Sequence, residues 1–74
     1  MVPVKRLIGI IKRYNPKTRD ADVVIRRDGK KILLVVTGAD ARYMSNAIYH
    51  MLRALGRRNV RRWTCKSSWC VSFS

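Results

Sequence analysis

Apolar and polar residues alternate in several short runs along this chain. The first run, Val4 to Tyr14, is rich in β-branched and aliphatic residues and is followed by Asn15-Pro16. Residues of this kind favour strands, and Asn-Pro marks a turn. We therefore expect a strand over residues 4–14, followed by a loop that continues through Asp20.

Two further apolar runs, Ala21 to Arg27 and Lys30 to Val36, flank the dipeptide Asp28-Gly29. This dipeptide is typical of a type I′ hairpin turn, because both central positions of that turn need positive φ. The expected register pairs Ile25 with Ile32, Val23 with Leu34, Arg26 with Lys31 and Val24 with Leu33. The first two pairs form an apolar side of the hairpin, and the last two form a mixed, basic side.

The middle of the chain carries an apolar stripe at helical spacing. Its members recur at i, i+3, i+4, i+7, i+8 and i+11, and they are Met44, Ala47, Ile48, Met51, Leu52 and Leu55. This pattern predicts a helix from about Ala39 to Leu55 that lies on a sheet. Thr37 and Asp40 fit a capping box at its start, and Gly56 suits a left-handed residue at its end.

Residues alternate in strand fashion again between Val60 and Ser74. Together with a turn near Ser67-Ser68, this pattern predicts a second hairpin. The expected order is strand, strand, strand, helix, strand, strand. Such an order favours the α+β class, as a small two-layer domain whose mostly antiparallel sheet carries one helix on one face.

The second expected hairpin contains both cysteines of the chain. A turn at Ser67-Ser68 places Cys65 directly opposite Cys70, near disulfide distance, so this pair is a candidate disulfide. A mesophilic cytosol would keep the thiols reduced, whereas a hyperthermophile could oxidise them. Zinc needs about four ligands and His50 is the only histidine, so we expect no metal and no cofactor.

The composition of the chain indicates which class of partner the protein binds. The chain has 74 residues and a formal net charge of +13, with 17 Lys and Arg against four Asp and no Glu. We expect residues 1–74 to form a single folded domain, because 47% apolar residues with clear periodicity is too much for a disordered chain. Charge of this size favours a nucleic acid partner, whose phosphates displace the counterions.

The sequence also bears on where the protein is located and on its source. The apolar stretch near the start covers only Leu7 to Ile11 and is followed by Lys12-Arg13 without a cleavage-type ending, which favours a cytoplasmic protein. No run approaches the ~18 apolar residues of a membrane span. Binding to an anionic membrane surface stays a secondary alternative. The abundance of arginine and the absence of Gln are compatible with a thermophilic source.

Basic residues gather in two segments. Four arginines lie within six residues and have no carboxylate within 15 positions, which favours phosphate binding over a merely solvated corner; they are Arg57, Arg58, Arg61 and Arg62. A second group surrounds the first hairpin turn, where a solvated tip is an even alternative; it comprises Arg26, Arg27, Lys30 and Lys31.

Tryptophan is interleaved with these cations. Trp63 follows Arg62 directly and precedes Lys66, an arrangement suited to stacking on an unpaired base while the cations hold phosphates. A place in the core is an equal alternative for Trp63, and Trp69 is expected to be exposed near the turn.

Catalytic groups are sparse. Asp28-Gly29-Lys30 resembles the acid-x-lysine element of metal-dependent nucleases, but nothing in the sequence brings Asp20, Asp22 and Asp28 together around Mg²⁺. A lone histidine beside an apolar helix stripe, as His50 is, is more often structural than catalytic. We therefore expect a protein that is not an enzyme.

The order of strand, helix and hairpin from Val35 through Phe73 resembles the C-terminal half of the Alba family of archaeal nucleic acid-binding proteins. The resemblance rests on element order and basic character and covers about half of the chain. The family's N-terminal half and its lysine-bearing loop have no counterpart here. No functional residues are transferred from it.

These observations favour a small, strongly basic protein that binds structured RNA through an arginine-rich corner, as a ribosomal or ribosome-associated protein would. Eleven arginines against six lysines tilt the expectation toward RNA, because guanidinium groups stack on exposed bases as well as contacting phosphate. Two alternatives stay open: a sequence-independent duplex-DNA binder of chromatin or viral type, and a small ribonuclease or toxin that uses His50.

Overall fold

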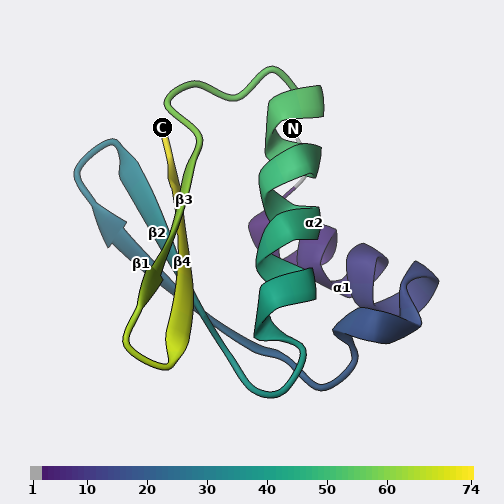
Figure 1. The fold of residues 1–74 in the computed structure, drawn as a ribbon. Helices are drawn as coiled ribbons and strands as arrows, with labels where there is room; N and C mark the ends of the chain where they lie inside the picture. Colours follow the sequence, from purple (N-terminus) through teal and green to yellow (C-terminus); the bar gives the residue numbers. More distant parts are fainter. Residues whose placement is uncertain (1–2) are drawn as a thin grey trace.

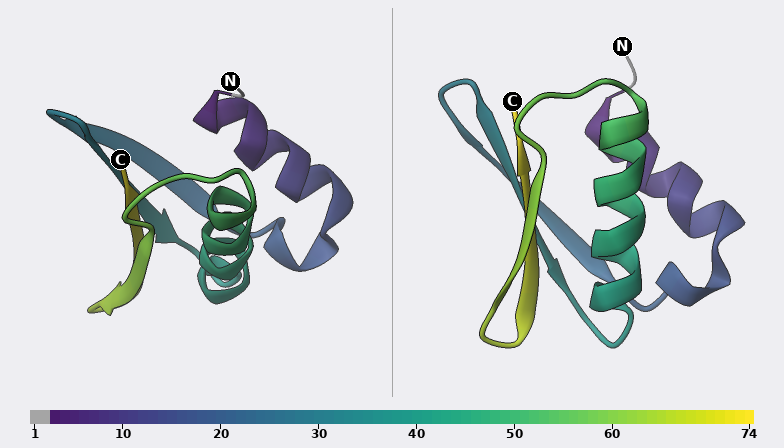
Figure 2. Two further views of the ribbon diagram at one scale, coloured as in Figure 1. Left: turned by 90° about the horizontal axis from the view of Figure 1, so that it is seen from above. Right: turned by 45° about the horizontal axis from the view of Figure 1, so that its top comes forward.

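The computed structural model describes residues 3–74. Its elements, in chain order, are α1 (Val4–Tyr14), the 3-10 turn η1 (Pro16–Thr18), β1 (Asp22–Asp28), β2 (Lys31–Thr37), α2 (Ala41–Ala54), β3 (Arg61–Cys65) and β4 (Ser68–Phe73) (Figure 1). The strands form one sheet in the order β1-β2-β4-β3, and every neighbouring pair is antiparallel. Both helices lie on the same side of this sheet, as Figure 2 shows. The expected two-layer α+β class is confirmed.

The first expected strand is wrong, because residues 4–14 form helix α1. Val4, Leu7, Ile8 and Ile11 recur at i, i+3, i+4 and i+7, which is helical rather than strand spacing. Leu7 and Ile11 are buried in the core, and Val4 and Ile8 pack against it. The preference of β-branched residues for strands is therefore outweighed by burial of one helical face of this segment. Lys12 and Arg13 also lie in the last turn of α1, where cations favour the helix dipole.

The β1–β2 hairpin exists, but its turn is one residue later than expected. Asp28 pairs with Lys31, so Gly29-Lys30 is the two-residue loop. Gly29 has a φ of +61° and Lys30 is not among the residues of positive φ, which is the pattern of a type II′ turn rather than type I′. The register therefore pairs Ile25 with Leu34 and Val23 with Val36. Each partner shifts by two positions, so the expected apolar and basic sides are preserved.

Helix α2 confirms the expected stripe except at Leu55, which lies beyond the last helical residue and is 53% exposed. The start of the helix is also built differently from the expectation. Asp40 is the N-cap residue, yet its side chain makes no cap hydrogen bond. Its Oδ2 accepts a hydrogen bond from the Asp20 backbone N–H at 2.8 Å, and its own N–H donates to the Asp20 carbonyl at 2.8 Å. The expected capping box is thus wrong, because this carboxylate ties the helix start to the chain before β1.

The end of α2 is as expected. Gly56 has a φ of +76°, and its N–H donates to the Arg53 carbonyl at 3.0 Å. The next N–H, of Arg57, donates to the Leu52 carbonyl at 3.0 Å. This pair of hydrogen bonds is a Schellman motif, which suits glycine because of the left-handed residue it contains.

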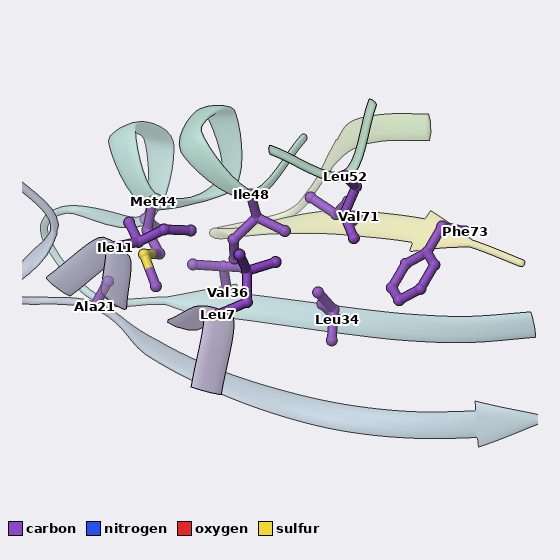
Figure 3. Close-up of a cluster of buried hydrophobic side chains, with 11 residues drawn as sticks. Leu7, Ile11, Ala21, Leu34, Val36, Met44, Ile48, Leu52, Val71 and Phe73 are labelled. Carbon is purple, nitrogen blue, oxygen red and sulfur yellow. The ribbon is translucent and has the colours of Figure 1, made fainter. Parts of the chain in front are cut away.

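The hydrophobic core lies between α2, α1 and one face of the sheet (Figure 3). Leu34, Val36, Met44, Ile48 and Val71 are fully buried at its centre. They occupy alternate positions of the central strands β2 and β4 and the predicted stripe of α2. Among residues 3–74, no helix is long and apolar enough to cross a membrane.

The β3–β4 hairpin, in contrast to the first, turns one residue earlier than expected. Cys65 pairs with Ser68, and Lys66-Ser67 is the loop, with Lys66 at a φ of +56°. Cys70 therefore lies opposite Trp63 and not opposite Cys65. The direct opposition of the two cysteines is wrong, and both thiols are free in the structure.

Candidate nucleic-acid interface

One face of the sheet is left without a helix. Leu34, Val36 and Val71 point to the helices, so the alternate residues of each strand point the other way. We call that side the open face; its side chains include Val24, Arg26, Lys31, Leu33, Val35, Arg61, Trp63, Cys70 and Ser72. No element among the described residues 3–74 covers it, as Figure 2 shows.

The register aligns the open face into rows across all four strands. One row reads Val24, Val35, Cys70 and Trp63 from β1 to β3. Its two outer members are well exposed, with Val24 at 50% and Trp63 at 41% of their accessible surface. An exposed indole at the end of an apolar row is the kind of group on which unpaired bases stack.

The next row places cations at both of its ends. It reads Arg26, Leu33, Ser72 and Arg61 from β1 to β3. Both arginines are exposed. Three strand spacings separate them, about 14 Å between backbones, so a chain of nucleotides that crosses the sheet would meet a guanidinium group on each side. Arg61 and Trp63 are also neighbours on this face, being two residues apart on one strand.

The two basic segments come together at one end of the sheet. Because β2 lies beside β4, the β1–β2 turn lies at the same end as the loop that leads into β3. Lys31 and Arg61 line one cavity of about 240 Å³ there, together with Asn59, Ser72 and Phe73. We call this region the basic end of the sheet; it comprises Arg26, Arg27, Lys30, Lys31, Arg57, Arg58 and Arg61.

The loop before β3 is held in place by the last strand. The guanidinium carbon of Arg57 lies 5.5 Å from the centre of the Phe73 ring. The Arg58 carbonyl accepts a hydrogen bond from the Ser74 N–H at 3.0 Å. Asn59, at a φ of +54°, donates from Nδ2 to the Ser74 hydroxyl at 3.0 Å. These contacts fix the direction in which the exposed side chain of Arg58 leaves the loop.

Arg62 does not join this surface. Strand alternation turns it to the helix side, where its guanidinium carbon lies 3.9 Å from the centre of the Trp69 ring. Its Nε donates to the Ser45 hydroxyl at 3.0 Å, and Nη2 donates to the Arg42 carbonyl at 3.2 Å. Burial, and secondly the charge of Arg42, lower the pKa of Arg62 from its ordinary value. The predicted cluster of four arginines is therefore split between two faces, and Arg62 ties β3 to α2.

The two tryptophans have different surroundings. Trp63 is exposed on the open face, which leaves it available for stacking. Trp69 is partly buried and packs against the core beneath Arg62, so the expectation of an exposed Trp69 is wrong. Its position on β4 explains this, because residues 69, 71 and 73 share the helix side.

The remaining candidates lie away from the basic end. Lys66 is exposed in the β3–β4 turn, at the opposite end of the sheet. Cys70 is buried, and burial, followed by the nearby Cys65 thiol, raises its pKa. His50 is exposed on α2, with its ring edge-on to Tyr49. Residues 3–74 contain no group of three His, Cys, Asp or Glu side chains that could hold a metal.

Sequence reasoning missed two features of this surface. Arg26 and Arg61 lie at opposite ends of one row on the open face. This placement depends on the order of the strands, and no local sequence signal shows that order. Tyr49 and Asn46 of α2 were not expected to face a cavity, yet they line one beside β3. Their positions opposite the apolar stripe of the helix were the available signal.

Comparisons with protein-family models, with curated proteins and with solved structures find no significant match to this chain. The likeness in element order to the Alba family therefore receives no support from them. What the chain binds has to be argued from its own open face and basic end.

Proposed function

We propose that this protein is a non-enzymatic nucleic acid-binding protein whose target is structured RNA with unpaired bases. The observation that carries the proposal is the exposed Trp63 beside Arg61 on the open face. An aromatic ring accepts a base by stacking, and the adjacent guanidinium group holds the phosphate of the same strand.

Charge supports a polyanion as the ligand. The chain carries +13, and the exposed cations of the hairpin tip and the loop before β3 gather at one end of the sheet. Phosphates that bind there would release condensed counterions, which is the main source of affinity in such complexes. Arg58 and Arg61 contribute guanidinium groups, which suit paired contacts to phosphate oxygens.

Unpaired RNA suits the shape of the surface better than a plain duplex does. The open face carries an exposed indole at its edge, and bases inside a duplex are stacked on each other and cannot reach it. Loops and bulges of structured RNA offer unstacked bases next to helical phosphate clusters. They would use Trp63 and the basic end together. A ribosomal or other ribonucleoprotein particle supplies such RNA.

A second candidate ligand is duplex DNA bound through the β1–β2 hairpin. The observation that favours it is the exposure of four cations around one narrow tip, namely Arg26, Arg27, Lys30 and Lys31. Two-stranded ribbons of this kind fit a major groove or track a phosphate backbone.

The test compares fluorescence-labelled ligands by anisotropy: an RNA hairpin with a single-stranded loop, a blunt RNA duplex and a DNA duplex of equal length. We expect the looped RNA to bind most tightly and Trp63→Ala to weaken that complex by about 1–3 kcal/mol. Arg61→Ala should weaken it as well, whereas Arg6→Ala removes the same charge from exposed α1 and serves as the matched control.

The outcomes separate the candidates. Equal or tighter binding to the DNA duplex, with no effect of Trp63→Ala, would favour the hairpin-tip mode. Loss of affinity that is the same for Arg61→Ala and Arg6→Ala would mean that the charge acts without a defined site, and would contradict the proposal.

A further inference from the structure

A groove runs along the outer edge of the sheet, between β3 and α2. Two adjoining cavities form it, of about 710 Å³ and about 360 Å³, and both are lined by Asn46 and Arg62. The larger one is completed by Tyr49, Val60, Arg61 and Trp63. Its volume falls in the ~300–1,000 Å³ range of small-ligand sites. We call it the α2–β3 groove.

The groove is lined by cations and aromatic rings, and no carboxylate of residues 3–74 lines it. Arg42 and Tyr43 close one end beside Trp69, and Arg61 and Trp63 lie at the other. The Arg62 guanidinium lies on the Trp69 ring at 3.9 Å and so forms part of the wall. A lining of this kind attracts an anion that also carries an aromatic ring, which is the chemistry of a nucleotide.

Polar groups on α2 point at the same space. Tyr43, Asn46 and Tyr49 are three residues apart from one another, so they lie along one side of the helix. The Tyr49 hydroxyl oxygen accepts a hydrogen bond from Arg53 Nη1 at 3.2 Å, which leaves its hydrogen free to donate. The Asn46 carboxamide makes no hydrogen bond with any residue in the described range 3–74 and keeps both donors and its acceptor oxygen.

From these contacts we propose that the α2–β3 groove is a base-reading site for one unpaired nucleotide, and that Asn46 reads the edge of its base. The inference rests on the proposed function. It adds the α2–β3 groove to the open face as a second surface that contacts the RNA. Trp63 and Arg61 border both the groove and the open face, so a single strand that stacks on the open face can pass over the β3 edge into the groove.

Adenine is the base that this lining matches best. A carboxamide offers an adjacent donor and acceptor, and adenine presents the complementary pair at N6 and N7 as well as at N6 and N1. A purine also gives a larger stacking surface to Trp63 or Tyr49 than a pyrimidine does. Arg61 would then hold the neighbouring phosphate.

The test measures base preference as well as affinity. Labelled single-stranded oligo(A), oligo(C) and oligo(U) RNAs of equal length are titrated with the folded chain at fixed salt. We expect oligo(A) to bind at least about fivefold more tightly than the other two. Asn46→Leu, which keeps the shape of the side chain but removes its hydrogen bonds, should bring the three affinities together. His50→Leu, on the same helix but outside the groove, should retain the preference.

A second measurement observes the group itself. The chain has three asparagines, so its side-chain amide signals are few in an NMR spectrum of ¹⁵N-labelled protein. Addition of oligo(A) should shift the Asn46 amide signals. If they stay in place while backbone signals of β3 move, the groove does not read a base.

Failure of this inference differs from failure of the proposed function. Wild-type protein that binds none of the RNAs would overturn both. Protein that binds all three equally, or whose preference survives Asn46→Leu, would overturn the base-reading site alone. A groove that instead receives a protein strand along the β3 edge would give this second result.

Discussion

The guanidinium carbon of Arg62 lies 3.9 Å from the centre of the Trp69 ring, and this side chain joins three elements at once. It stacks on β4 and donates hydrogen bonds to Ser45 and Arg42 of α2. A cation in a basic sequence cluster thus acts as a structural link between the helix and the edge strand.

We expect Arg62→Ala to lower the free energy of unfolding by about 1–3 kcal/mol, because one cation–π contact and two hydrogen bonds are lost. Urea denaturation followed by circular dichroism measures this. Arg61→Ala removes the same charge from the open face and should leave stability nearly unchanged. Equal stability of both variants, with equal loss of RNA affinity, would mean that Arg62 serves the ligand and not the fold.

The sequence was sufficient to predict α2 and the existence of both hairpins, but not their exact turns, and it was insufficient to predict α1. In α2 a six-member stripe and Gly56 agree on one element, so the period is unambiguous. In residues 4–14 the β-branched composition favoured a strand while the spacing of Leu7 and Ile11 favoured a helix. The spacing decides, because burial of one face contributes more than local preference.

The candidate site was predictable only in part. Alternation along β3 already implies that Arg61 and Arg62 point to opposite faces, so the division of the cluster could have been expected. The meeting of Lys31 and Arg61 could not, since it depends on β4 inserting between β2 and β3. An error of one residue in the β3–β4 turn also moved Cys65 away from Cys70, its expected partner.

Gly38 is expected to be the glycine least tolerant of substitution. It has a φ of +102°, and a Cβ placed on it would lie 2.6 Å from the Asp20 carbonyl oxygen. That oxygen accepts the hydrogen bond from the Asp40 N–H, so it cannot move without disturbing the start of α2. Gly38→Ala should destabilise the fold by about 3 kcal/mol or more.

Gly29→Ala is the control for this prediction. Gly29 also has positive φ, at +61°, but a Cβ there meets nothing within 4 Å. We expect a cost of about 1–2 kcal/mol from backbone strain alone. Thermal or urea unfolding of both variants gives the comparison. Equal costs would show that the contact with Asp20 relaxes without penalty.

The two thiols should differ in reactivity. Cys65 is exposed, whereas Cys70 is buried and has a raised pKa, so less of it is thiolate at a given pH. Because the thiolate is the reactive form, a thiol reagent at pH 8 should modify Cys65 quickly and Cys70 slowly. Cys65→Ser should remove the fast phase, and Cys70→Ser the slow one. A single phase in the folded wild-type protein would contradict the difference in burial.

The salt dependence of RNA binding should locate the charges that touch phosphate. Arg26 and Lys30 are exposed at the hairpin tip, and Arg6 and Arg13 are exposed on α1. For single-stranded RNA, each phosphate contact contributes about 0.7 to the magnitude of the slope of log K against log salt concentration. Arg26→Gln with Lys30→Gln should therefore reduce the slope by about 1.4. The charge-matched pair Arg6→Gln with Arg13→Gln should leave it nearly unchanged, because α1 lies on the far side of the sheet from the open face. Equal reductions from both pairs would show that the net charge acts diffusely and that the basic end of the sheet is not where phosphates bind.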